Sequence, residues 1–166
     1  TANSQVLAAN GIAFDVIGSP GLASTNLSNY QVVLVSGDQP WFTYQNLATR
    51  AAQIETFVLQ GGSLEYHAAG WGWNGGDPTG VILPGGMRIQ TAFTGQNEVL
   101  LPAHPIVAGL PGVFFASNHV HFTSIPAGAE RIVRDPLGQP NVVVYRHGAG
   151  GRAGADTRNP VPPGEG

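Results

Sequence analysis

Hydrophobic and polar residues follow two different periods along this chain, and the clearest pattern lies in its first half. A nearly continuous apolar run over residues 31–37 is typical of a central parallel strand that is covered on both faces. Four apolar residues then recur at helical spacing and predict a helix over residues 44–60. They are Leu47, Ala51, Ile54 and Val58. Gly61 and Gly62 end this helix, and residues 63–67 form the next strand. The pattern predicts a strand–helix–strand unit with a right-handed crossover.

The segments before this unit are shorter. Residues 4–10, followed by Gly11, predict the end of a helix with a glycine stop. Residues 13–17 predict a strand, and residues 27–30 predict a single helical turn. A helix and a strand are therefore expected ahead of the main unit.

The second half of the chain has the period of short strands joined by turns. Residues 88–94 and 98–101 are expected to pair as antiparallel strands, and residues 114–122 form another strand. Residues 131–134 and 142–146 predict a hairpin across a turn rich in Pro, Gly and Asp. This half therefore predicts antiparallel pairing.

From Gly148 onward the chain contains Gly, Pro and charged residues without any period, so we expect little structure of its own there. The expected organisation is one α/β domain over residues 1–147 and a Gly/Pro-rich tail over residues 148–166. A chain of 166 residues is long enough for one substantial core.

Composition then removes several classes of function. The chain has no Cys, which excludes a cysteine nucleophile. Its net charge is −3 and its seven cations do not cluster, so nucleic acid is not an expected partner. No apolar run reaches the roughly 18–20 residues of a membrane helix, so no membrane partner is expected either.

Four phrases of the sequence together resemble the glutamine-amidotransferase-like superfamily, and within it the trehalose-utilisation (ThuA-like) branch. They occupy residues 30–38, 57–67, 83–86 and 104–111, and the resemblance covers roughly residues 4–146. It implies a flavodoxin-like three-layer α/β sandwich with a mainly parallel sheet and an antiparallel hairpin extension.

The resemblance also implies two departures from the family. The chain begins inside the helix that follows the first strand of the fold, so that strand is missing, supplied by a neighbour, or located on an upstream segment. Unpaired sheet edges would then favour self-association. The second departure is His67, which stands at the elbow where true amidotransferases carry the nucleophilic Cys. Without a thiol, glutaminase activity is not expected.

The candidate catalytic residues are Glu65, His67 and Asp38. His67 would serve as a general base or metal ligand, or it is a hydrogen-bonded histidine retained with the scaffold. Glu65 lies two residues earlier on the same strand, so both side chains point to one face. It would be a carboxylic acid with a raised pKa, working with a second carboxylate such as Asp38 or Asp77, or it pairs with an Arg or with backbone amides.

Aromatic and amide side chains near the elbow are the candidate ligand-binding residues. They are Trp41, Trp71, Trp73, Asn74 and Asp77. Indole rings stack on the C–H faces of sugars while amides and carboxylates bond to hydroxyls, so the group is typical of a sugar-binding platform. The alternative is that the rings only cover the open end of the sheet.

His119 and His121 form a His-x-His pair on a predicted strand, so both imidazoles can face one divalent metal. The alternative is one exposed and one packed histidine. No cofactor is otherwise expected.

The leading interpretation is a non-catalytic carbohydrate-binding or accessory module, and the resemblance favours a secreted or periplasmic location. One alternative is a hydrolase acting on glycosides or esters through Glu65 and His67. The other is a structural or oligomerisation fragment.

Overall fold

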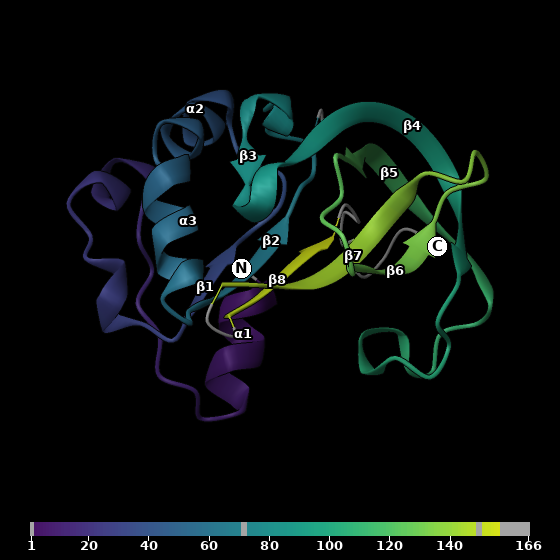
Figure 1. Ribbon diagram of the computed structural model, residues 1–166, viewed down its shortest axis with the longest axis horizontal. Helices are drawn as coiled ribbons and strands as arrows, with labels where there is room; N and C mark the ends of the chain where they lie inside the picture. Colours follow the sequence, from purple (N-terminus) through teal and green to yellow (C-terminus); the bar gives the residue numbers. More distant parts are fainter. Residues whose placement is uncertain (1, 71–72, 149–150, 157–166) are drawn as a thin grey trace.

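The computed structural model describes residues 2–70, 73–148 and 151–156. Within these residues, strands form one curled sheet in the order β1-β2-β8-β7-β6-β4-β3, and β5 pairs with β4 (Figure 1). The strands are β1 (Val32–Val35), β2 (Ser63–His67), β3 (Ile82–Leu83), β4 (Met87–Val99), β5 (Val113–Thr123), β6 (Glu130–Arg134), β7 (Pro140–His147) and β8 (Gly151–Asp156). The α-helices are α1 (Ala2–Ala9), α2 (Trp41–Thr49) and α3 (Ala51–Leu59).

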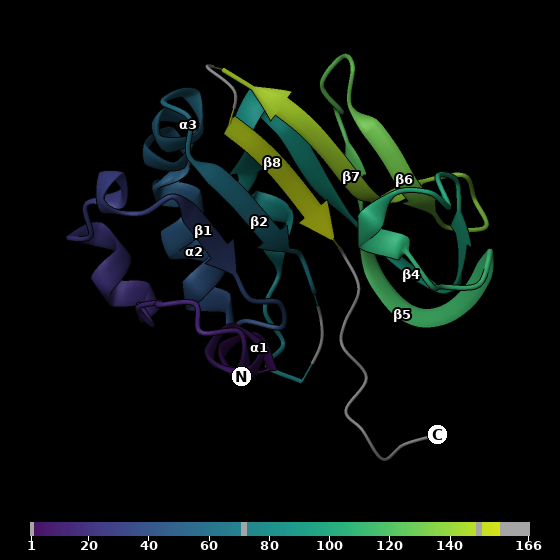
Figure 2. The same cartoon turned by 90° about the horizontal axis from the view of Figure 1, so that it is seen from below.

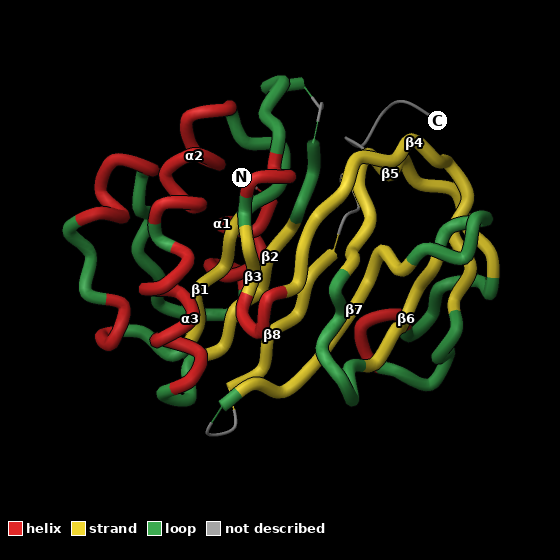
Figure 3. Tube along the Cα trace, turned by 45° about the horizontal axis from the view of Figure 1, so that its top comes forward, coloured by secondary structure: helices red, strands yellow, loops and turns green. Residues whose placement is uncertain are grey.

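The helices gather at the β1 end of the sheet, and the strands β4 to β7 extend away from them (Figure 3). Helices α2 and α3 lie together beside β1 and β2, whereas α1 lies apart from them, below β1 in Figure 1. Short 3₁₀ turns connect the remaining elements. They are η1 (Ser19–Ala23), η2 (Leu27–Asn29), η3 (Pro78–Gly80), η4 (Pro84–Gly86) and η5 (Pro105–Val107).

The predicted strand–helix–strand unit is confirmed. Strands β1 and β2 pair in parallel, with Val32 opposite Ser63 and Val35 opposite Tyr66. The helical segment between them is divided, because Arg50 has non-helical angles (φ −106°, ψ 9°) and separates α2 from α3. The helix predicted over residues 44–60 is therefore two helices.

The main core lies between helices α2 and α3 and the sheet. Alternate residues of β2, Leu64 and Tyr66, are buried in one cluster with the apolar face of α3. That face consists of Ile54, Phe57 and Val58, so the apolar spacing read from the sequence is the packed face of the helix. A smaller cluster around Ile132 and Val142 fills the distal part of the sheet.

The prediction of a mainly parallel sheet is wrong, because only the pairs β1–β2 and β2–β8 are parallel among the described strands. Residues 88–101 do not form a hairpin. Gly95 lies inside β4, a continuous strand of 13 residues that pairs with β5 along most of its length. Two register shifts between Thr91 and Gln96 bend this ribbon where the sequence suggested a turn. The coarse α/β class is confirmed, and a flavodoxin-like sandwich remains a prediction.

Three further expectations are also wrong. Residues 13–17 form no strand, and β1 is an edge strand whose Val32 is 55% exposed, not a central strand covered on both faces. Residues 151–156 are not part of a structureless tail, because β8 inserts between β2 and β7. Its small residues Ala153 and Ala155 are buried in the main core. The helix end at Gly11 (φ 67°), the turn η2 and the β6–β7 hairpin are confirmed.

Candidate functional site

The carboxyl ends of β1 and β2 meet at one edge of the sheet, because the two strands are parallel neighbours. The loop after β1 passes directly over the end of β2. A Cβ atom placed on Gly37 would lie 3.3 Å from the Cβ of Ala69 and 3.4 Å from the Cβ of His67. Glycine at this position therefore lets the first loop lie against the elbow that the sequence identified.

Asp38 and Asn74 join the two loops, and we call this pair the rim clasp. The backbone N–H of Asn74 donates to Asp38 Oδ1 at 3.0 Å, and Asn74 Nδ2 donates to the Asp38 carbonyl oxygen at 2.8 Å. Asp38 has a left-handed backbone (φ 52°), which Asp tolerates better than most residues. Its carboxylate, predicted as catalytic, therefore holds the loop after β2 in place.

A buried tyrosine supports the clasp from below. The Tyr44 hydroxyl, on α2, donates to the carbonyl oxygen of Ala69 at 2.6 Å and accepts from the backbone N–H of Gln39 at 3.3 Å. Burial raises the pKa of Tyr44 to about 12, so the hydroxyl stays protonated and able to donate. Both loops are thus fixed to the same helix.

Glu65 and His67 lie on one face of β2, as the strand alternation predicts, with His67 Nε2 2.8 Å from Glu65 Oε1. Glu65 is half-exposed and His67 is largely covered. The hydrogen bond from His67 lowers the pKa of Glu65, although burial opposes the shift. The prediction of a raised pKa is therefore wrong, and Glu65 is a carboxylate near neutral pH. This carboxylate accepts from Nε2–H, which makes Nδ1 the basic nitrogen of the neutral ring.

This pairing gives stability a pH dependence. Glu65 ordinarily has a pKa of 4.5 and a lower one in the folded chain, so its contribution is present above about pH 4.5 and is lost as the pH falls through the folded value. Because the carboxylate is half-exposed, we expect Glu65→Gln to lower the unfolding free energy by less than about 1 kcal/mol at pH 7. The gap between variant and wild type should be smaller at pH 3 than at pH 7. Denaturant titrations at both pH values measure it, and a gap that widens in acid would contradict the pairing.

Two tryptophans flank the rim clasp along the chain. Trp73 precedes Asn74 and is 97% exposed; Trp41 begins α2 three residues after Asp38 and is 61% exposed. The ring of Trp41 meets the ring of Phe42 edge to face, with centroids 6.1 Å apart. Trp71, the third predicted indole, lies outside the described residues.

The remaining predicted residues have other neighbours. Asp77 caps the turn η3 by accepting from the backbone N–H of Thr79 at 2.9 Å. Burial lowers the pKa of His121, while the charge of Asp135 acts in the opposite direction. The structure does not describe the side chain of His119. Among the side chains that are described, no three His, Cys, Asp or Glu residues gather as a metal site, so the two-histidine site stays a prediction.

The structure also joins two residues that the sequence did not connect. His147, at the end of β7, lies 2.5 Å from the Glu55 carboxylate on α3, and the other oxygen of Glu55 accepts from the backbone N–H of Gly85 at 3.0 Å. The partners are 92 positions apart, so no local pattern could reveal them. The pair fixes α3 to the sheet and to η4.

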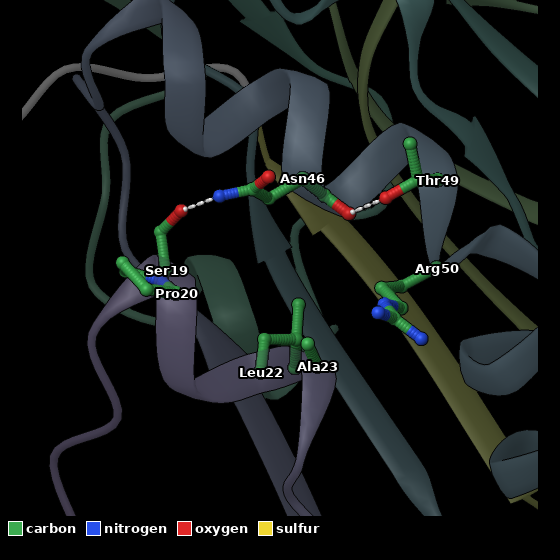
Figure 4. A pocket seen from close by; sticks show the side chains of 7 residues that line it. All are labelled: Ser19, Pro20, Leu22, Ala23, Asn46, Thr49 and Arg50. Atoms are coloured by element: carbon green, nitrogen blue, oxygen red, sulfur yellow. Dashed lines mark hydrogen bonds between the residues drawn. The ribbon is translucent and has the colours of Figure 1, made fainter.

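Two surface hollows lie elsewhere. One, of about 50 Å³, lies between η1 and the end of α2, where Asn46 donates to Ser19 Oγ (Figure 4). The other, of about 280 Å³, lies between η2 and α3 and includes Gln53 and Phe57. Glu65 and His67 line neither of these two hollows.

Comparisons of the sequence with known proteins identify a distant relative. No family model matches the chain. An uncharacterized protein of Clostridium acetobutylicum is 26% identical over 143 residues, which is 84% of this chain. The chain spans about 15% of the length of that relative.

Solved structures show the fold more clearly. A cytoplasmic protein of Salmonella typhimurium matches 95% of this chain and 74% of its own, with a TM-score of 0.61 and 15% identity. A proposed GMP synthase subunit of Thermoplasma acidophilum matches 93% of this chain and 75% of its own, with a TM-score of 0.58 and 13% identity. A second cytoplasmic protein of Salmonella typhimurium matches 90% and 66%, with a TM-score of 0.51 and 12% identity. The chain therefore shares its overall fold with these three proteins. Within the described ranges, no helix is long and apolar enough to cross a membrane.

Proposed function

We propose that this chain is a non-catalytic, carbohydrate-associated binding or accessory module, built on an amidotransferase-like fold of the ThuA-like branch. The observation that carries the proposal is the exposure of Trp41 and Trp73, which flank the rim clasp along the chain. Large exposed aromatic rings on fixed backbone are suited to stacking on the apolar faces of sugars. The proposed ligand surface is the loop edge at the ends of β1 and β2.

The rim clasp supports this proposal through the entropy of binding. Both loops are hydrogen-bonded to each other and, through Tyr44, to α2. A ligand that meets preformed loops does not have to order them, so less of the interaction free energy is lost. Asn74 and Asp77 are both exposed. Amide and carboxylate groups are of the chemical type that forms hydrogen bonds with sugar hydroxyls.

Glutaminase chemistry is left out of the proposal for a chemical reason. Attack on a glutamine amide in this fold needs a thiolate, and the sequence contains no Cys. The imidazole at the elbow is hydrogen-bonded to Glu65 and is not positioned as a replacement nucleophile by any described contact. A protein whose fold resembles that of a GMP synthase component therefore need not release ammonia.

The proposal predicts that both indoles contribute to affinity. Trp73→Ala and Trp41→Ala should each weaken binding of an oligosaccharide by about two- to twelvefold, because one aromatic stacking contact contributes roughly 0.5–1.5 kcal/mol and 1.4 kcal/mol is a factor of ten. Calorimetric titration of a panel of soluble oligosaccharides measures the dissociation constants.

Phe115→Ala is the matched control, since Phe115 is an exposed aromatic residue on β5, in the antiparallel half of the sheet. It should bind as the wild type does. Equal losses in all three variants, or binding that survives in the double tryptophan variant, would contradict the proposed surface. Loss in Trp71→Ala would extend the surface to that residue.

The alternative is a hydrolase acting on glycosides or esters, and the contact between Glu65 and His67 is what favours it. In this mechanism Glu65 orients the ring and His67 Nδ1 accepts a proton from water or from a substrate hydroxyl. The same protein preparations should then turn over chromogenic glycosides or esters, with activity abolished in both Glu65→Gln and His67→Ala. Such a result would overturn the non-catalytic proposal. No cofactor is proposed; metal analysis after zinc addition tests the pair His119 and His121.

A further inference from the structure

The outer edge of β1 is a second surface that the proposed ligand site does not use. Among the described strands, β1 lies at one edge of the sheet and pairs with β2 on its inner side. Ser63 N–H donates to the Gln31 carbonyl at 2.9 Å, so Gln31 and Val33 direct their backbone groups toward β2. Because successive residues of a strand alternate, Val32 and Leu34 direct their N–H and C=O groups outward. Within the described ranges, no hydrogen bond to these outward groups is found.

An exposed apolar segment lies beside this edge. We call residues 12–17 the N-terminal arm; they form neither helix nor strand. Its apolar side chains are unusually open to solvent, and Val16 is 81% exposed. The Tyr30 hydroxyl donates to Asp15 Oδ2 at 2.8 Å, which holds the arm near the start of β1 (Figure 2). The exposed apolar residues are Ile12, Phe14, Val16, Ile17 and Val32.

This edge also lacks the features that usually prevent strands from pairing. Natural edge strands carry charged side chains, prolines or bulges, and β1 has the sequence Val-Val-Leu-Val. Asp15 is the only charged residue between Thr1 and Val35, and it is already hydrogen-bonded. An unprotected edge beside a patch of this kind is typical of a surface that is covered in the working protein.

We propose that a second copy of this chain covers it, with β1 of each copy pairing antiparallel across a two-fold axis. The patch can bind a second copy because a two-fold contact brings the same residues of both copies together. An uncharged apolar surface causes no electrostatic repulsion in such a contact. A strongly charged partner would find no complementary charge in the patch. The pairing would join two sheets into one. The two proposed ligand surfaces would then lie on opposite edges of that sheet, because the carboxyl ends of the two β1 strands point in opposite directions.

The mass of the protein in solution tests this pairing. We expect the wild type to elute with twice the 17.2 kDa mass of one chain in light-scattering chromatography at high micromolar concentration. Val32→Pro should halve that mass, because it removes an outward N–H that β2 does not use and proline is tolerated at the first residue of a strand. Val32→Lys should do the same by adding a charge to the edge.

Leu137→Lys is the control, since it adds the same charge to an exposed apolar residue in the β6–β7 turn. It should remain dimeric, and circular dichroism should be unchanged in all variants. Hydrogen exchange locates the contact: the amides of Val32 and Leu34 should be protected in the wild type and lose protection on dilution. A monomeric wild type, or Val32 variants that keep the doubled mass, would overturn the proposal. Sugar affinity is measured separately, so failure of one proposal leaves the other intact.

Discussion

Gly76→Ala is expected to destabilise the protein by about 1–3 kcal/mol and to abolish ligand binding at the rim, because there is no space for a methyl group at this position. A Cβ on Gly76 would lie 1.9 Å from the carbonyl oxygen of Gln39 and 2.8 Å from the ring of Tyr44. The collision is with backbone, which cannot move without shifting the loop after β1. The loop that carries Trp73 would therefore be displaced. Denaturant unfolding and oligosaccharide titration measure the two effects.

Gly80→Ala provides the matched control, four residues further along. A Cβ there meets no atom within 4 Å, so its stability and affinity should remain near those of the wild type. If Gly76→Ala unfolded at the same denaturant concentration as Gly80→Ala, the two loops would not be packed as described.

Tyr44→Phe is expected to lower the unfolding free energy by about 1–3 kcal/mol, while Tyr66→Phe should leave it unchanged or raise it. Both tyrosines are buried. The Tyr44 hydroxyl bonds to Ala69 and Gln39, and its removal leaves two covered backbone groups without that partner. The Tyr66 hydroxyl is buried with no hydrogen-bond partner found in the described part of the chain, so its loss removes a desolvated group and no bond.

The comparison between these variants isolates the hydrogen bonds, since both substitutions delete the same atom from a buried ring. Thermal and denaturant unfolding of the two proteins should therefore separate them clearly. Equal destabilisation by both substitutions would mean that ring packing, and not the bonds below the rim clasp, determines the cost. Tyr44→Phe should also weaken oligosaccharide binding, because both loops lose their contact with α2.

The parts of the fold that could be predicted from the sequence are those that depend on local periodicity. The spacing of Ile54 and Val58 identified the packed face of α3, and alternation along β2 correctly placed Glu65 beside His67. The prediction of a turn within residues 88–101 failed because glycine, here Gly95, occurs both in turns and in bent strands. Pairing with β5 makes this segment a bent strand. Strand β8 was missed for the same reason, since its Gly-Arg-Ala-Gly sequence is ordered by β2 and β7.

The candidate site shows the same limit. The sequence placed Glu65 and His67 on one face of a strand, and the catalytic role that it assigned to Asp38 stays a prediction. In the structure this carboxylate meets Asn74, a contact across 36 positions that no spacing rule contains. The pKa of Glu65 was predicted to rise because a carboxyl in an apolar strand suggests burial. It falls because the strand face is half-open and His67 donates to it.

Indole N–H signals report directly on whether sugars bind at the ends of β1 and β2. The decisive experiment follows these signals for the three tryptophans by ¹⁵N NMR while an oligosaccharide is added, and single substitutions assign each signal to Trp41, Trp71 or Trp73. We expect the Trp41 and Trp73 signals to shift together along one saturable curve, while the backbone amide of Phe115 remains in place. Saturable binding that leaves both indole signals unmoved would contradict a sugar-binding surface at the ends of β1 and β2.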